Sequence, residues 1–281
     1  MSLIAFATCK TLPEADWDEE MLLASCAKAG LATELAAWDD PSVDWSKYNL
    51  VVPRSTWNYY EQPEAFGRWV RHVTDVTTLQ NPATLILGNI HKSYLLDLAT
   101  KGIDIVPTLL FERGSRQSLA SVPWPKFVVK PAISASSYMT HVFTRETTSD
   151  AELFLHKILA DRDAMVQEYV ASVPQGGEVA LIHIEGELTH GITKHPRYHG
   201  GEESVSEAFA PTDEQRAIAA RVMSTISEPC LYCRVDLMLG NCGRWLLSEL
   251  ELIEPSLFFR QHEPALDRFV SALCNSVVAK T

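Results

Sequence analysis

The stretch Leu231–Leu252 reads LYCRVDLMLGNCGRWLLSELEL and predicts an antiparallel β-hairpin. Its two apolar runs are separated by the segment 240–243, whose glycine and asparagine residues favour a tight turn. Because side chains alternate between the two faces of a strand, each strand carries its charged residues on a single face. Four charged residues interrupt the apolar pattern in this way: Arg234, Asp236, Glu249 and Glu251.

Charged side chains on apolar strands are costly to bury unless they are paired or serve a chemical purpose. If the hairpin brings its two charged faces together, three carboxylates and one guanidinium converge. Carboxylate oxygens suit Mg²⁺, which proteins bind through one or two carboxylates together with substrate phosphates. The alternative is a solvent-facing ladder in which Arg234 pairs with a carboxylate, and the spacing alone leaves both interpretations open.

Two lysines occupy positions that suit phosphate binding. Lys92 follows a Gly-Asn break and opens a helical pattern, whereas Lys130 ends an apolar strand directly before a proline. The segment 133–138 that follows is rich in serine and alanine, so it predicts a mobile loop. A lysine beside such a loop can hold phosphate by its charge and through backbone N–H groups. Each lysine, taken alone, is better explained as a solvated surface residue.

A strand predicted over 164–170 carries two polar residues, Gln167 and Glu168, shortly before a loop that contains Gly176 and Gly177. The free backbone groups at a strand end can hydrogen-bond the edge of an adenine ring, and a carboxylate can hold ribose hydroxyls. An ordinary strand that ends in a turn explains the same pattern.

The first 80 residues or so alternate strand and helix patterns, which predicts a small α/β unit with a parallel sheet. No glycine-rich fingerprint follows the first strand, and this argues against a Rossmann dinucleotide site. Arg54, Ser55 and Trp57 follow a predicted strand end, where open α/β sheets commonly bind ligands. Arg54 can take a carboxylate bidentately, or it can be a structural arginine packed on Trp57.

Composition excludes several classes of protein. The 281 residues carry 24 Lys and Arg against 36 Asp and Glu, a net charge of −12, which argues against general binding to nucleic acid or to anionic membranes. The six cysteines offer one C-x-x-C pair, at Cys230 and Cys233, without the further ligands of a zinc site. Neither a secretory segment nor a membrane span is evident. We therefore expect a reduced, cytoplasmic protein, and a homodimer stays open.

The order of these motifs resembles that of ATP-grasp ligases. Along the chain come Lys92, FVVKP with Lys130, a small-residue loop, VQEYV, Glu178, RVDL with Asp236, and LSELELIEPSL with Glu249 and Glu251. The closing segment is similar to that of D-alanine–D-alanine ligases and glutathione synthetases. One departure is Glu251, which stands where the family usually has asparagine; it keeps an oxygen ligand and adds a negative charge.

The resemblance implies a mixed α/β (α+β) chain with the ATP-grasp fold. Residues 1–88 are expected to form an N-terminal α/β domain that precedes the ATP-grasp domain of residues 89–281. Within the latter, a small lid subdomain is expected over residues 107–168, followed by a subdomain built on an antiparallel sheet.

The resemblance also implies an ATP-dependent carboxylate–amine ligase. In such enzymes ATP phosphorylates a carboxylate, an amine attacks the acyl phosphate, and phosphate leaves. Arg234 would then face the developing oxyanion, Lys194 of GITKHP would meet the γ-phosphate or acyl phosphate, and the small-residue loop would close as a lid. The expected cofactors are ATP and two Mg²⁺ ions, with a small amino-acid-like substrate.

Each group of site residues follows from the same resemblance. The expected metal ligands are Asp236, Glu249 and Glu251. The expected ATP contacts are Lys92, Lys130, Ser136, Ser137, Gln167, Glu168, Tyr169, Val170 and Glu178. The expected substrate contacts are Arg54, Ser55, Trp57 and Glu254, the last of which is also a candidate for the surroundings of the metal.

A narrower similarity concerns three segments, VVPRSTWNYY at 51–60, AWDDPSVDW at 37–45 and LELIEPSLFF at 250–259. They resemble the small ATP-grasp enzymes grouped with O-ureido-serine cyclo-ligase, which closes the ring of D-cycloserine. The resemblance thus favours an intramolecular, ring-closing ligase. Two alternatives stay open, namely an intermolecular amino-acid or dipeptide ligase on the same scaffold and a non-catalytic nucleotide-binding protein.

Overall fold

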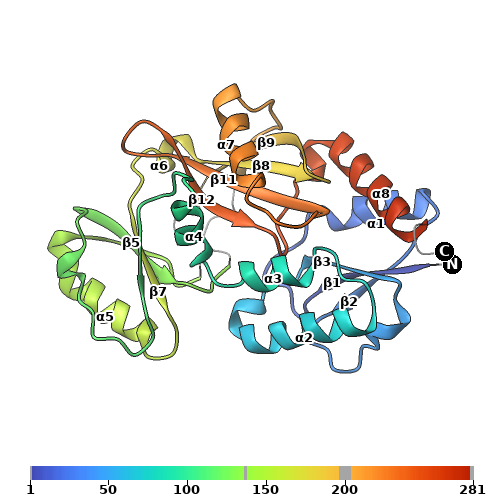
Figure 1. The fold of residues 1–281 in the computed structure, drawn as a ribbon, viewed down its shortest axis with the longest axis horizontal. Coiled ribbons are helices and arrows are strands. Elements are labelled where there is room, and N and C mark those ends of the chain that lie inside the picture. The colour runs from blue at the N-terminus through green and yellow to red at the C-terminus, as the bar shows by residue number, and fades with distance from the viewer. Residues whose placement is uncertain (1, 136–137, 196–203, 279–281) are drawn as a thin grey trace.

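Three β-sheets organise the computed structural model, which describes residues 2–135, 138–195 and 204–278 (Figure 1). In chain order they have three, four and five strands, and below they are the first, second and third sheets. In Figure 1 the second sheet lies at the left, the third at the top and the first at the lower right. Helices accompany all three sheets, so the predicted mixed α/β class is confirmed.

The first sheet is parallel and buried on both faces. Its strands are β1 (Leu3–Thr8), β2 (Ala32–Ala37) and β3 (Leu50–Ser55), with β1 in the centre. Its helices are α1 (Glu19–Lys28), α2 (Pro63–Val76) and α3 (Ala83–Asn89). Ile4 and Phe6 pack toward α1, whereas Ala5 and Ala7 pack toward α2 and α3. This alternation follows from the two-residue period of a strand and explains why β1 is apolar throughout.

The second sheet is antiparallel and covered on one face only. Its strands are β4 (Thr108–Phe111), β5 (Lys126–Pro131), β6 (His141–Thr144) and β7 (Ala164–Glu168), in the order β4-β7-β5-β6. Phe127 and Val129 of β5 pack against helix α5 (Thr148–Leu159). The alternate residues, Lys126, Val128 and Lys130, point to the opposite face and line a cavity.

The third sheet is also antiparallel and carries the predicted hairpin. Its strands are β8 (Glu178–Ile184), β9 (Glu187–His195), β10 (Ser204–Val205), β11 (Tyr232–Leu239) and β12 (Trp245–Glu251), in the order β10-β9-β8-β11-β12. The neighbouring helices are α4 (Tyr94–Thr100), α6 (Val173–Gly176) and α7 (Asp213–Met223). Cys233, Val235 and Leu237 pack toward α4 and α7, which leaves Arg234 and Asp236 on the other face.

Helix α8 (Glu263–Val278) returns to the first sheet and lies beside α1 (Figure 1). Phe259, Phe269 and Leu273 join the same apolar cluster as Ile4 and Phe6 of β1. The first sheet is therefore covered on one face by residues from the C-terminal part of the chain. Among the described residues, no helix combines the length and the apolar content needed to cross a membrane.

Candidate active site

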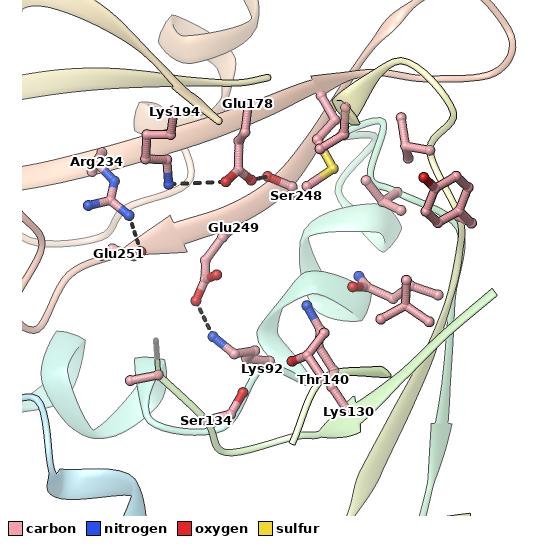
Figure 2. Close-up of a pocket in the computed structure, with 18 of the residues that line it drawn as sticks. Lys92, Lys130, Ser134, Thr140, Glu178, Lys194, Arg234, Ser248, Glu249 and Glu251 are labelled. Carbon is pink, nitrogen blue, oxygen red and sulfur yellow. Dashed lines mark hydrogen bonds and ion pairs between the residues drawn. The ribbon is translucent and has the colours of Figure 1, made fainter. Parts of the chain in front are cut away.

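A cavity of about 580 Å³, here called the central cavity, opens between the second and third sheets. The second sheet lines it with β5, β6 and β7, the third sheet with β8, β9, β11 and β12, and the segment after β3 with Trp57 and Tyr59. Figure 2 shows charged side chains from these elements pointing toward one another across it.

The hairpin places its four charged residues on one wall of the central cavity. Strands β11 and β12 pair so that Arg234 lies opposite Glu251 and Asp236 lies opposite Glu249. The register shifts by one residue directly after Asp236, and the extra residue on β12 is Ser248. Such a bulge re-aims the side chains that follow it, and the Ser248 hydroxyl donates to the backbone carbonyl of Asp236 at 3.0 Å.

Asp236 lies at the centre of a buried ion-pair network. Its side chain is only 1 % exposed, and Arg234 donates to its two carboxylate oxygens at 2.8 and 2.9 Å. Lys194 Nζ approaches Asp236 Oδ2 at 2.5 Å and Glu178 Oε2 at 3.0 Å. Burial alone would raise the pKa of Asp236, but Arg234 and Lys194 outweigh burial and hold this pKa below its ordinary value. The carboxylate is therefore ionised at neutral pH.

Of the other two carboxylates of the wall, Glu249 has a separate cation and Glu251 shares Arg234 with Asp236. Lys92 donates to Glu249, and Arg234 donates to Glu251 (Figure 2). Burial would lower the pKa of Lys92, but Glu249 outweighs it and raises this pKa. Burial raises the pKa of Glu251 to about 7, against the opposing effect of Arg234.

A third lysine of the central cavity has a different character. Lys130 lies beside Lys92, and burial together with the charge of Lys92 lowers the pKa of Lys130 (Figure 2). Lys130 lies in β5, opposite Met165 of β7, and the backbone N–H of Lys92 donates to the carbonyl of Ala132 at 2.9 Å, just after β5. Two cations at one end of a cavity suit a polyanion such as a triphosphate.

The chemistry of the donor set fits Mg²⁺. Asp236 and Glu249 face each other across two paired strands, and both are the hard oxygen ligands that Mg²⁺ prefers. Within the described ranges, no three acidic, histidine or cysteine side chains yet converge on one point. The ion pairs account for this, because each carboxylate is turned toward a lysine or an arginine.

The residues expected to contact ATP lie along the central cavity. Among its lining residues are Lys92, Lys130, Gln167, Glu168, Tyr169, Val170 and Glu178. The amide of Gln167 donates to the Thr108 hydroxyl at 2.9 Å, and Lys126 lies 3.7 Å from the centre of the Tyr169 ring. Ser136 and Ser137 lie outside the described residues.

The expected substrate contacts divide into two pairs. Trp57 and Glu254 line the central cavity, where the indole N–H of Trp57 donates to the backbone carbonyl of Glu254 at 3.1 Å. Arg54 and Ser55 do not line it. The Ser55 hydroxyl donates to the Thr8 hydroxyl at 2.9 Å, within the first sheet.

Arg54 is a buried structural contact. It lies on the same face of β3 as Leu50 and Val52, and this face packs against the C-terminal part of the chain. Its guanidinium donates to the carbonyl of Pro255 at 3.1 Å and lies 5.8 Å from the Tyr232 ring. The structure therefore agrees with a structural role for Arg54, which lies within β3 beside Tyr232 instead of Trp57 and does not line the central cavity.

Three residues that the sequence does not single out fix the strand carrying Glu249 and Glu251. Asn89 donates to the carbonyl of Leu250 at 2.8 Å and accepts from the N–H of Leu252 at 2.9 Å. The Tyr94 hydroxyl accepts from the N–H of Leu250 at 3.0 Å, and the Asn81 amide donates to the carbonyl of Leu252 at 2.9 Å. These side chains satisfy the free edge of β12 as a further strand would. In the sequence Asn89 stands out only as part of the Gly-Asn break before Lys92, and it forms the last residue of α3.

Comparison with known proteins places the chain among ligases. Residues 4–81 match the family model described as the N-terminal domain of D-cycloserine synthetase DcsG. The cycloserine biosynthesis protein DcsG of Streptomyces lavendulae is 31% identical over 293 residues, which cover 97% of this chain and 98% of that protein. A crystal structure of D-cycloserine synthetase DcsG has a TM-score of 0.88 at 32% identity and covers 98% of this chain and 100% of its own.

More distant structures share the fold. The D-alanine–D-alanine ligase of Bacillus anthracis in complex with ATP has a TM-score of 0.68 at 10% identity, over 99% of this chain and 98% of its own. The ATP-grasp ligase PsnB with a minimal precursor has a TM-score of 0.64 at 15% identity, over 100% of both chains. These likenesses confirm the predicted ATP-grasp fold.

Proposed function

This chain belongs to the family of the cycloserine biosynthesis protein DcsG, and from this membership we propose that it closes a small ring, joining a carboxylate to a nitrogen of the same molecule. The family is one of ATP-dependent ligases that form carbon–nitrogen bonds with small-molecule substrates. The observation that carries the ring-closing assignment is the match to DcsG over 97% of this chain and 98% of that protein. The expected product is cycloserine or a close analogue, which places the enzyme in antibiotic biosynthesis.

The reaction balances in two steps. A carboxylate oxygen of the substrate takes the γ-phosphoryl group of ATP, which gives an acyl phosphate and ADP. A nitrogen in the side chain of the same substrate then attacks the carbonyl carbon, loses a proton, and phosphate leaves with that oxygen. The protein's task is positioning and charge neutralisation, because phosphoryl transfer needs little covalent help.

We propose that the nucleotide lies along β5 and β7. Lys92 and Lys130 would hold phosphate oxygens, and the segment 167–170 would hold the adenine. Glu178 is proposed for the ribose, although in the nucleotide-free protein it pairs with Lys194 and Ser248. Ser136 and Ser137 stay in the proposal as parts of the phosphate-covering loop.

The acidic wall is the proposed metal site. Asp236, Glu249 and Glu251 would hold two Mg²⁺ ions, whose bound charge would neutralise phosphate oxygens. Arg234 is proposed to stabilise the oxyanion that forms at the attacked carbonyl carbon, and Lys194 to neutralise the acyl phosphate. Trp57 and Glu254 line the substrate end, whereas Arg54 and Ser55 are left out because neither reaches the central cavity.

The division of the chain is part of the same proposal. The first sheet lies within residues 1–88, and the second sheet spans 108–168, which supports a lid over residues 107–168 inside an ATP-grasp unit of residues 89–281. The central cavity lies where these parts meet, as expected for a site that a lid closes over.

Release of ADP with a panel of substrates tests the function. O-ureido-serine of each configuration, supplied without a second amine, should give one ADP per molecule of cyclic product, which mass spectrometry identifies. Glu249→Gln should abolish both products while the circular-dichroism spectrum is retained. ADP that forms only when a second amino acid is added, together with a dipeptide, would favour the intermolecular alternative. ATP binding without ADP release from any substrate would favour the non-catalytic alternative.

A further inference from the structure

We propose that two buried lysines, Lys92 and Lys194, act as exchangeable counter-ions of the acidic wall, so that Mg²⁺ enters the wall only together with nucleotide phosphate. Lys92 pairs with Glu249 and Lys194 with Asp236, whereas Arg234 stays as the fixed partner of Glu251 and Asp236. The inference rests on the metal roles proposed above for Asp236 and Glu249. It adds an order of binding that the ligase activity alone does not require.

Asp236 is the clearest case, because its oxygens are fully engaged. Oδ1 accepts from Arg234 at 2.8 Å, and Oδ2 accepts from Arg234 at 2.9 Å and from Lys194 at 2.5 Å. With its side chain only 1 % exposed, no further cation reaches the carboxylate unless a basic group moves. Arg234 is 7 % exposed and is fixed by a further hydrogen bond to the carbonyl of Ser256, at 3.3 Å. Lys194, on a single flexible chain of methylenes, is therefore the group that can leave.

Glu249 is held in the same way from the opposite side of the cavity. Its partner Lys92 is buried and comes from the segment before α4, which belongs to neither strand of the hairpin (Figure 2). Lys130 lies alongside, and it is drawn in Figure 2 without a bond to any other side chain shown. When a triphosphate enters, Lys92 and Lys130 gain phosphate oxygens as partners, and Glu249 loses its counter-ion.

The local charge balance makes this exchange necessary. Four carboxylates, Glu178, Asp236, Glu249 and Glu251, face three paired cations, Lys92, Lys194 and Arg234. A Mg²⁺ ion added to this nearly neutral cluster has to displace an ammonium that is itself buried and would be left without a partner, which is costly. Added together with phosphate, the same ion neutralises new negative charge while the lysines keep a partner.

The proposal makes Lys92 different from a residue that only binds phosphate. Removal of such a residue weakens nucleotide binding and leaves the affinity of the free protein for a metal ion unchanged. Removal of Lys92 should weaken nucleotide binding but strengthen metal binding in the nucleotide-free protein, because Glu249 is then an unpaired carboxylate. The two opposite effects of one substitution are the signature of an exchangeable counter-ion.

Titration of Mn²⁺, followed by electron paramagnetic resonance of the free ion, tests this on the nucleotide-free protein. Wild type should bind Mn²⁺ weakly, and Lys92→Met should lower the dissociation constant about tenfold or more, equivalent to about 1.4 kcal/mol. Lys194→Met should act in the same direction through Asp236. Lys126→Met is the matched control: this lysine also lines the central cavity but lies over the Tyr169 ring, so the Mn²⁺ affinity should stay within about twofold of wild type.

A double variant assigns the effect to the named pair. Lys92→Met combined with Glu249→Gln should return the Mn²⁺ affinity to the wild-type value, since the unpaired carboxylate is gone. The double variant also removes a buried charge, so it stays measurable if Lys92→Met fails to fold. Thermal melts of every variant confirm that the protein titrated is folded.

Two results would overturn the proposal. One is a folded Lys92→Met whose Mn²⁺ affinity without nucleotide equals that of wild type; the other is a folded Lys92→Met/Glu249→Gln double variant that still binds Mn²⁺ as tightly as Lys92→Met does. Neither measurement involves turnover, so a failure of the counter-ion proposal can be told apart from a failure of the ring-closing proposal. Conversely, if no substrate releases ADP but the variants change the Mn²⁺ affinity as expected, the ligase proposal is rejected and the counter-ion exchange is retained.

Discussion

At the scale of single residues, Glu254 has the most strongly raised pKa among the carboxyl groups that line the central cavity. Burial, with the charges of Glu251 and Glu249, raises the pKa of Glu254 to about 8. The indole N–H of Trp57 donates to the backbone carbonyl of Glu254 and so fixes the main chain beside the central cavity. At neutral pH the free protein therefore keeps this carboxyl mainly protonated.

This shift makes the stability of the protein depend on pH. The folded pKa of Glu254 is about 8, against 4.5 for an ordinary glutamate, so folding takes up a proton between these values. The contribution of Glu254 to stability is complete below pH 4.5 and is lost as the pH rises through 8. Glu254→Gln should match wild type near pH 4.5 and exceed it at pH 8 by a few kcal/mol in the free energy of unfolding. Urea denaturation at both pH values checks this; equal differences at the two pH values would contradict it.

Lys130 should contribute to nucleotide binding and little to the fold. Lys130 lies close to Lys92, and among the described residues no carboxylate forms an ion pair with it. A phosphate should therefore be its first strong partner. Lys130→Met should weaken ATP binding about tenfold or more, as expected for loss of a charge-assisted hydrogen bond. Calorimetric titration with a non-hydrolysable ATP analogue measures this. Lys157→Met, on the exposed outer side of α5, serves as the control and should leave the affinity unchanged.

The sequence predicted the positions of some of these site residues and not of others. Alternation along each strand was enough to group Arg234 with Asp236 and Glu249 with Glu251, because strand parity is a local property. Whether the two groups share a face depends on the register between the strands, which the bulge at Ser248 sets. The position of Arg54 depends on which segment covers its face of β3, and that segment is about 200 residues away in the chain. No local pattern carries such information.

At the scale of elements, β12 shows how an edge strand is completed without another strand. Its backbone meets residues 104–106 at Leu247, then Tyr94, Asn89 and Asn81 in turn toward its end. The hairpin was predictable from its turn and its apolar runs, but the bulge at Ser248 was not, because one extra residue leaves the apolar pattern almost unchanged. Its effect is to aim Glu249 and Glu251 into the cavity.

Removal of the Asn89 side chain should therefore be costly. It leaves the carbonyl of Leu250 and the N–H of Leu252 buried without their partner, so Asn89→Ala should lower the free energy of unfolding by about 2–4 kcal/mol. Asn241→Ala is a matched control, since Asn241 also makes one donated and one accepted backbone hydrogen bond but is exposed. The control should cost less than about 1 kcal/mol in the same chemical denaturation experiment. Equal losses in the two variants would argue against the edge contacts.

At the scale of the whole molecule, the first and third sheets are joined through one buried tyrosine. The Tyr232 hydroxyl lies 2.6 Å from the carbonyl of Pro53 and 2.7 Å from the carbonyl of Ile253. Its ring packs in the cluster that β1, α1 and α8 share. The order of motifs predicted the ATP-grasp fold. The return of α8 to the first sheet was not predicted, because the amphipathic pattern of a helix does not indicate which element its apolar face packs against.

Tyr232→Phe should destabilise the joined core while leaving the cavity wall in place. The single hydroxyl proton that two buried carbonyls share is lost, which predicts a loss of about 1–3 kcal/mol in the free energy of unfolding and a lower melting temperature. Tyr60→Phe, which keeps its half-buried ring against Tyr138, should change the melting temperature little. Differential scanning calorimetry compares the two, and an unchanged melting temperature for Tyr232→Phe would contradict the proposed role of its hydroxyl.

The contact of α8 with the first sheet also bears on how the protein is made. Between Ser55, the end of β3, and Glu263, the start of α8, lie about 200 residues, since 263 minus 55 is 208. At about 5–20 residues per second, a ribosome needs roughly 10–40 s to add them. Throughout that time α1 can pack on Ile4 and Phe6, but their contacts with Phe269 and Leu273 of α8 cannot form. The apolar core on this face of the first sheet is therefore completed only when α8 has left the ribosome, well after the strands of the sheet have been made.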